Sequence, residues 1–234
     1  MEEIETLIKD TLQVAEKSTE KSTEKTLSIL ELITSGGIGG NLVMGTLIIL
    51  SVVAIYILIE RYSSIKKASI EDESFLKSIQ NFVEAKDIEA AKTLCKNTNT
   101  PISRMIEKGV NRIDKPMTDI SAAIENQGKL EVFKMENNLA NLATISGAAP
   151  MIGFLGTVIG MIVAFHEMAS AGGNIDVAML SQGIYTAMVT TVAGLIVGII
   201  AFISYNYLVS KVDKVVFMLE AKIIDFLDLL HHNE

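Results

Sequence analysis

The sequence predicts an all-α membrane protein with three transmembrane helices and long helical extensions beyond them. Residues 137–165 and 177–210 contain no charged residue, and each run exceeds the ~20 apolar residues that cross a bilayer. A third uncharged run, residues 41–59, is also long enough to span. The segment between the first and second runs has no strand-like alternation, and its apolar residues recur at helical spacing.

Composition limits the class of protein. The chain has 234 residues, of which 49% are hydrophobic, and its formal net charge is −8. The apolar fraction argues against a disordered or ordinary soluble protein, and the negative charge argues against nucleic acid as a partner. Cys95 is the single cysteine, so we expect no internal disulfide and assign the thiol no role.

The distribution of basic residues predicts the orientation in the membrane. Those close to the uncharged runs all flank one side: Arg61, Lys66, Lys67, Lys129, Lys134, Lys211 and Lys214. The positive-inside rule places that side in the cytoplasm. The predicted order is an extracytoplasmic amphipathic segment (1–40), transmembrane helix 1 (41–60), a cytoplasmic helical segment (61–136), transmembrane helix 2 (137–165), an extracytoplasmic loop (166–176), transmembrane helix 3 (177–210) and a cytoplasmic helix (211–234).

Helices are predicted outside the membrane as well. Pro101 and Pro116 are typical helix starts, and the absence of proline from 117 to 149 predicts one helix over residues 117–165, roughly 70 Å long. The third span is expected to continue along an apolar stripe, with a short unstructured tail at His231 and His232. The stripe consists of Val212, Val215, Val216, Leu219, Ile223, Phe226, Leu227 and Leu230.

A helical wheel gives the second and third spans one side of small residues and one side of bulky ones. The small side of the second span contains Ser146, Ala149, Pro150, Gly153, Gly156, Thr157, Gly160 and Ala164. That of the third contains Gly183, Thr186, Ala187, Thr190, Thr191, Gly194, Gly198 and Ala201. Small residues let helix backbones approach closely where lipid gives no hydrophobic drive. The stripes therefore predict helix packing, and because each small side is too poor in bulk to face lipid, we expect it to serve assembly as a homo-oligomer. The threonines add a second hypothesis, a wet or ion-conducting path.

The sequence lacks the motifs of an enzyme and the usual means of carrying protons. It has no phosphate-binding glycine loop, HExxH, cysteine pair or supported Ser/His/Asp set, so we expect no catalytic residue, metal or cofactor. The three uncharged runs, 41–59, 137–165 and 177–210, contain no Asp, Glu, Lys, Arg or His. Threonine hydroxyls can order water or ligate a dehydrated cation, but they do not titrate near neutral pH. This chain alone therefore cannot carry protons by side-chain titration.

The segments NLATISGAAPMIGFLGTVIGMIVAF and QGIYTAMVTTVAGLIVGIIAFISYN resemble the paired pore helices of the MotA/TolQ/ExbB proton-channel family, ExbB most of all. The similarity lies in Leu142-Ala143-Thr144-Ile145, Ala149-Pro150, Gly153, Leu155-Gly156-Thr157-Val158 and Gly160, then Gly183-Ile184, Ala187, Thr191, Gly194-Leu195 and Tyr205-Asn206. It covers about a third of the chain. Many relatives carry a glutamate three residues after the Gly-Ile pair, where this chain has Thr186.

The resemblance implies a homopentamer with an oligomeric pore in a bacterial inner membrane. It further implies a single-span ExbD-like partner that supplies a membrane aspartate, and a TonB-like protein that passes force to the outer membrane. Thr157 and Thr191 match the family's pore threonines; Thr190 and Thr186 share their face. A TolQ-like role in envelope integrity and a purely structural membrane scaffold remain alternatives, and the choice between proton and sodium stays open.

Overall fold

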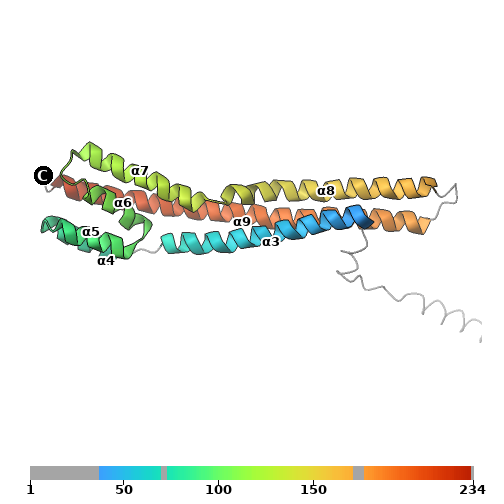
Figure 1. The fold of residues 1–234 in the computed structure, drawn as a ribbon, viewed down its shortest axis with the longest axis horizontal. Coiled ribbons are helices and arrows are strands. Elements are labelled where there is room, and N and C mark those ends of the chain that lie inside the picture. The colour runs from blue at the N-terminus through green and yellow to red at the C-terminus, as the bar shows by residue number, and fades with distance from the viewer. Residues whose placement is uncertain (1–36, 70–72, 171–176, 233–234) are drawn as a thin grey trace, which may run out of the picture.

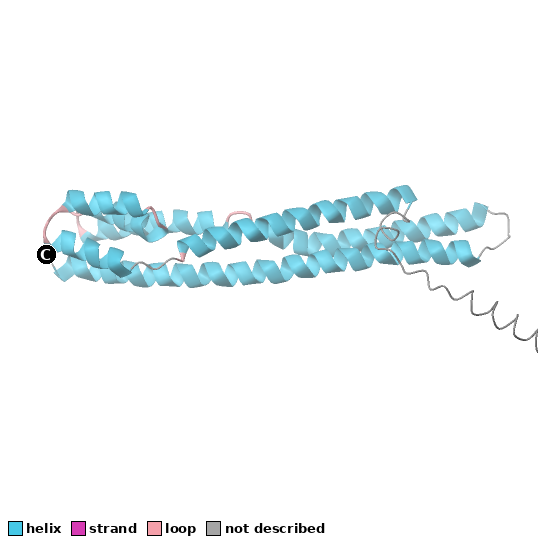
Figure 2. Ribbon diagram, turned by 90° about the horizontal axis from the view of Figure 1, so that it is seen from below, coloured by secondary structure: helices cyan, strands magenta, loops and turns pink. Residues whose placement is uncertain are grey.

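A computed structural model describes residues 37–69, 73–170 and 177–232, and every regular element in these ranges is a helix (Figures 1 and 2). The helices are α3 (Gly37–Ala68), α4 (Glu73–Glu84), α5 (Ile88–Thr98), α6 (Pro101–Val110), α7 (Met117–Glu136), α8 (Leu139–Ser170) and α9 (Val177–His232). The predicted amphipathic helix near the N-terminus and residues 171–176 of the predicted loop lie outside the described residues.

Three stretches are long and apolar enough to cross a membrane, which confirms the all-α, three-span prediction. The apolar parts of α3, α8 and α9 lie side by side at one end of an elongated molecule (Figure 1). α8 and α9 form an antiparallel hairpin, and α3 packs against both through the buried side chains of Val43, Leu47, Ala54 and Ile57.

The other end is a bundle of shorter helices, which we call the polar bundle: α4 to α7 with residues 211–232 of α9. Local sequence sets its helix starts. Asp87 accepts a hydrogen bond from the Ala90 amide at 3.0 Å and caps α5, whereas Thr100 and Ser103 form a capping box before α6 with Pro101 in its first turn. Pro116 precedes α7, so both predicted proline starts are confirmed.

α9 continues without interruption for 56 residues. Its predicted apolar stripe faces the bundle, with Val216 and Leu227 partly buried and the other six members buried. The expectation of an unstructured tail at the histidines was wrong, because α9 includes both His231 and His232.

The predicted continuous helix over residues 117–165 was wrong, because α7 ends at Glu136 and α8 begins at Leu139. Asn138 lies in the left-handed region with φ of 65°, a conformation that asparagine tolerates better than most residues. In an unbroken helix the Lys134 carbonyl would accept from the amide of residue 138. Instead, Nη1 of buried Arg61 on α3 donates to it at 2.8 Å, so a side chain satisfies a carbonyl at the end of α7.

Candidate functional site

The small sides of α8 and α9 pack against each other within one chain. A Cβ atom added to Gly194 would lie 2.6 Å from the carbonyl oxygen of Ala149 and 2.8 Å from the Cα of Gly153. A Cβ on Gly153 would lie 2.7 Å from the carbonyl oxygen of Thr190. Real Cβ atoms essentially never approach that closely, so only glycine lets these two backbones touch.

The remaining small residues extend this contact along the hairpin. An added Cβ would meet Thr190 and Val43 at Gly156, Ala187 at Gly160, Ala164 at Gly183 and Pro150 at Gly198. Pro150 has no N–H, so it leaves the Ser146 carbonyl without its usual helical partner. The Cβ position of Gly198 lies 3.1 Å from that oxygen. The structure thus places Pro150 and six glycines of the two predicted small sides in the α8–α9 contact.

Three of the four predicted threonines meet at the centre of this contact. The hydroxyls of Thr157 on α8 and Thr191 on α9 are hydrogen-bonded to each other, and either can donate. Thr157 also contacts the carbonyl oxygen of Ala187 at 3.0 Å, and Thr191 contacts that of Gly153 at 3.1 Å. Each helix therefore offers one carbonyl to a threonine of the other.

Thr190 completes the cluster and is more deeply buried, with 3% of its surface exposed. Its hydroxyl lies 2.7 Å from the carbonyl oxygen of Ala187 and 3.2 Å from that of Gly153. Thr186 does not join, because its hydroxyl donates only to carbonyls of its own helix, those of Gln182 and Gly183. We call Thr157, Thr190 and Thr191 with the carbonyls of Gly153 and Ala187 the hydroxyl cluster.

The cluster is rich in acceptors. Each hydroxyl has one proton and two lone pairs, and each carbonyl oxygen has two lone pairs. If Thr157 donates to Ala187 and Thr191 donates to Thr157, each of the two hydroxyls keeps at least one lone pair that none of these hydrogen bonds uses. Such lone pairs can hold a water molecule or a cation that has lost part of its hydration shell. Thr157 and Thr191 are only partly buried, so this pair is reachable from the helix surface.

Sequence reasoning found the threonines but missed the two carbonyls. A backbone oxygen is invisible in a residue pattern, and Gly153 was singled out only for its lack of a side chain. The glycine itself could have indicated these carbonyls, because a glycine leaves the helix carbonyls beside it uncovered and open to a partner helix.

A second polar cluster lies in the polar bundle, around the carboxylate of Glu131, which is 2% exposed. Arg104 donates to both of its oxygens, at 3.0 and 2.6 Å, while Gln127 and Lys134 donate at 2.8 and 2.9 Å. Burial raises the pKa of Glu131, but the hydrogen bonds and charges of Arg104 and Lys134 outweigh it and hold that pKa below its ordinary value. This network lies outside the membrane spans and joins α6 to α7.

Comparison with known proteins matches residues 97–221 to the MotA/TolQ/ExbB proton channel family. The chain belongs to this family. The matched stretch includes α7, α8 and most of α9, and therefore the whole hydroxyl cluster. Family membership and the three apolar helices together make it a multi-pass membrane protein.

Individual members of the family are similar to this chain at low identity, two of the three below over most of its length. A putative biopolymer transport protein ExbB homolog of Methanothermobacter thermautotrophicus is 28% identical over 188 residues, 80% of this chain and 64% of that protein. A biopolymer transport protein ExbB of Aquifex aeolicus is 28% identical over 186 residues, covering 80% and 86% of the two chains. The Tol-Pal system protein TolQ of Haemophilus influenzae is 34% identical over 85 residues, 36% of this chain and 37% of that one. The chain thus spans less than two thirds of the length of the Methanothermobacter relative.

Proposed function

We propose that the protein is an ExbB-like subunit of an ion-driven motor or channel, and not an enzyme. In this proposal it lies in a bacterial inner membrane, works with an ExbD-like single-span partner, and converts the proton motive force into mechanical work for TonB-dependent outer-membrane transport. The observation that carries the proposal is the hydroxyl cluster, since it is a polar site between two charge-free spanning helices.

The partner is required by the chemistry of the spans. A proton path through a bilayer needs a group that binds and releases protons, and the uncharged runs 41–59, 137–165 and 177–210 of this chain contain no Asp, Glu, Lys, Arg or His. The hydroxyl cluster can orient water or hold a cation without titrating. A membrane aspartate on a partner helix would supply the titrating group. We propose that this aspartate lies at the exposed edge of the Thr157–Thr191 pair.

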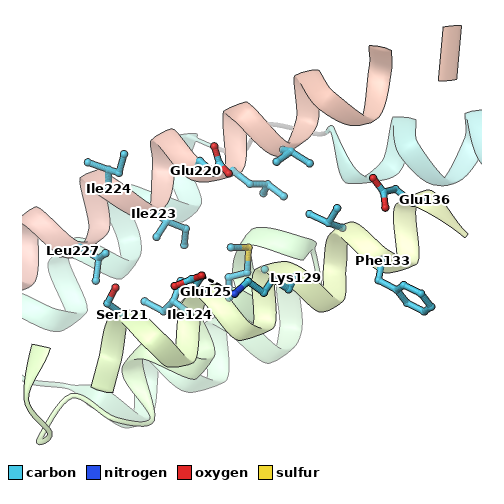
Figure 3. Close-up of a pocket in the computed structure, with 15 residues that line it drawn as sticks. Ser121, Ile124, Glu125, Lys129, Phe133, Glu136, Glu220, Ile223, Ile224 and Leu227 are labelled. Atoms are coloured by element: carbon cyan, nitrogen blue, oxygen red, sulfur yellow. Dashed lines mark ion pairs between the residues drawn. The ribbon is translucent and has the colours of Figure 1, made fainter. Parts of the chain in front are cut away.

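Assembly as a homo-oligomer, with five copies as the expected number, has to use surfaces other than the small sides of α8 and α9. Those sides are already packed together within the chain, so the small-residue stripes no longer argue for contacts between subunits. A groove of about 700 Å³ between α7 and α9 in the polar bundle is a better candidate for a contact between copies. Ile223, Ile224 and Leu227 line it from α9 (Figure 3), and Phe133 of α7 at its rim is 71% exposed.

A TolQ-like motor for envelope integrity is the second candidate, and the similarity to the Haemophilus TolQ favours keeping it. The two roles share the ion-driven step and differ in the protein that receives the force. Deleting the gene separates them. Loss of gradient-dependent uptake across the outer membrane supports the ExbB-like role, whereas detergent sensitivity with normal uptake supports the TolQ-like role.

Removing single hydroxyls tests the proposed site. Thr157→Val and Thr191→Val keep the side-chain shape and remove a polar group whose loss in a water-poor site costs roughly 1–3 kcal/mol. We expect gradient-dependent uptake to fall about tenfold to a hundredfold if the hydroxyl acts in the rate-limiting step. The readout is uptake at equal membrane abundance and unchanged oligomeric state, together with proton flux in vesicles that contain the subunit and its partner.

Thr144→Val is the matched control, because the Thr144 hydroxyl is exposed on α8 and donates only to the carbonyl of Ala140 in its own helix. Thr186→Val is a second control on α9. Full activity in both cluster variants would reduce the threonines to packing residues. Absence of flux with the partner present would favour the structural scaffold.

Labelling with a membrane-impermeant maleimide tests the proposed orientation. Ser18→Cys should react in intact cells, and Ser78→Cys should react only after lysis. The native thiol gives little background, because burial, with a smaller contribution from Glu107, raises the pKa of Cys95 to about 12 and the side chain is fully buried. Labelling of position 78 but not of position 18 in intact cells would reverse the proposed orientation.

A further inference from the structure

A basic pocket lies between α3 and α9, where both helices leave their uncharged runs. Its volume is about 330 Å³, within the range of roughly 300–1,000 Å³ of small-molecule sites. Lys66, Lys211 and Lys214 line it and are exposed. None of the three forms an ion pair with a residue that the structure describes, and none of the described carboxylates lines the pocket.

The floor and the membrane-facing rim of this pocket consist of buried and stacked side chains. Ile65, Leu208 and Val215 form the floor, and each is at most 3% exposed. Tyr62 and Tyr207 stack across the two helices at the rim, with ring centroids 6.4 Å apart. The Lys211 ammonium lies 5.4 Å from the centroid of the Tyr207 ring, so a cation–π contact holds its charge at the pocket.

The position of the pocket matches the edge of the bilayer. Tyr62 lies three residues after Ile59, the last residue of the uncharged run of α3, and Tyr207 lies four residues before Lys211, the first charged residue of α9. Tyrosine is enriched at the membrane–water interface, and lysine extends its ammonium toward the head groups. With Tyr62 and Tyr207 at the interface, the three lysines would lie at the level of lipid phosphates.

The surface on the membrane side of the pocket is apolar and open. Ile59 and Ile203 lie one helical turn from the two tyrosines and are 64% and 62% exposed. Ile55 and Ile200 continue these faces a turn further and are 47% and 48% exposed. An amphiphile with its phosphate among the lysines could lay its acyl chains along this surface, whereas a free anion would leave the surface uncovered.

We propose that this pocket binds the head group of an anionic phospholipid, with the phosphate held by Lys66, Lys211 and Lys214 and the acyl chains along the isoleucine faces of α3 and α9. Basic pockets between transmembrane helices are suited to such head groups. The inference concerns a lipid site on this subunit, and it stands whether or not the proposed motor role holds.

The experiment uses the purified full-length chain in mild detergent, with bound lipids counted by native mass spectrometry during titration with dioleoyl phosphatidylglycerol or dioleoyl phosphatidylcholine. We expect tighter binding of phosphatidylglycerol. Each lysine near anionic lipid contributes about fivefold in affinity, so the triple variant K66Q/K211Q/K214Q should bind phosphatidylglycerol about a hundredfold more weakly. The single variant Lys211→Gln should lose about fivefold, and binding of phosphatidylcholine should not change.

A matched control, K67Q/K108Q/K115Q, removes the same charge from exposed lysines outside the pocket. It should keep the affinity of the unmodified chain. Equal loss in the control and the pocket variant would overturn the proposal, because attraction would then follow net charge alone. Inorganic phosphate is titrated in a separate arm. Displacement of phosphatidylglycerol by phosphate at equal concentration would assign the pocket to a free anion and would also overturn it.

Discussion

The two ends of the molecule are packed by opposite choices of residue, and α9 shows both in one unbroken helix. Within the membrane part its buried positions are small as far as Ser204: Ala187, Thr190, Gly194, Gly198, Ala201 and Ser204. From Leu208, at the end of the uncharged run, into the polar bundle they are large: Leu208, Val212, Val215, Leu219, Ile223, Phe226 and Leu230. The stripe keeps its spacing of three or four residues throughout, and only the size of its side chains changes.

The change in the size of the buried side chains of α9 follows the change in solvent from lipid to water. In water, burying a large apolar side chain stabilises the fold by about 1.5–3 kcal/mol. In lipid that gain disappears, so bulky residues such as Met188 and Ile203 remain exposed, at 59% and 62%. Close backbone contact then holds the helices together. Polar contacts differ in the same way, because hydroxyls pair with carbonyls in the hairpin whereas Arg104 pairs with Glu131 in the bundle.

Enlarging a glycine in the hairpin should have the largest effect on stability. Gly194→Leu would place side-chain atoms where the Ala149 carbonyl and the Gly153 backbone lie, so the two helices must separate. We expect destabilisation at or above about 3 kcal/mol, the upper end for overpacking, measured as a loss of folded protein and a lower Tm in detergent.

Gly147→Leu is the matched control on α8, because nothing lies within 4 Å of the Cβ position there. Alanine substitutions at the same two glycines make the test more specific. Gly147→Ala should stabilise by up to about 1 kcal/mol through helix propensity, whereas Gly194→Ala should destabilise. If both alanine substitutions changed the stability in the same direction, close approach of the backbones would not be what holds the hairpin together.

Removing the buried charge of the bundle should have the next largest effect. Glu131→Gln leaves Arg104 without its carboxylate, and we expect a loss of about 2–3 kcal/mol, less than the 3–5 of a fully buried pair because Arg104 is 30% exposed on its side chain. Glu125→Gln, at the exposed pair with Lys129, should cost less than about 1 kcal/mol. Thermal unfolding of the two variants checks the difference.

The same carboxylate predicts the response to acid. Because the folded pKa of Glu131 is depressed below 4.5, its contribution is complete above that pH and is lost as the pH falls through the folded value. Tm should therefore decline in acid in the native chain, and the decline should be smaller in Glu131→Gln. Parallel Tm–pH curves for the two proteins would exclude this carboxylate as the cause.

The junction of the two ends should give the smallest effect. Asn138→Ala puts an alanine in the left-handed region, which costs about 1–2 kcal/mol relative to a right-handed conformation. Asn138→Gly removes the penalty and should be neutral or slightly stabilising. Urea or thermal unfolding distinguishes the two, and equal stability would indicate that residue 138 is free to leave this conformation.

Sequence alone determined the features that depend on local pattern. The lengths of the uncharged runs predicted the three spans, and the prolines predicted the starts of α6 and α7. The helical spacing of small and then large apolar residues predicted the stripe of α9. It also singled out Thr157, Thr190 and Thr191, together with Thr186, which lies outside the hydroxyl cluster. A helical wheel defines which residues share a face, because that depends only on the 3.6-residue repeat.

Tertiary structure decided what each face contacts. From the wheel we expected the small sides of α8 and α9 to serve assembly between subunits, whereas backbone approach at Gly153 and Gly194 shows that they meet each other within the chain. The break at Asn138 was also invisible, since asparagine fits a right-handed helix and the left-handed turn alike, and Arg61 supplies the partner that the broken helix loses. Glu131 and Arg104 are 27 residues apart, so only the packing of α6 on α7 brings them together.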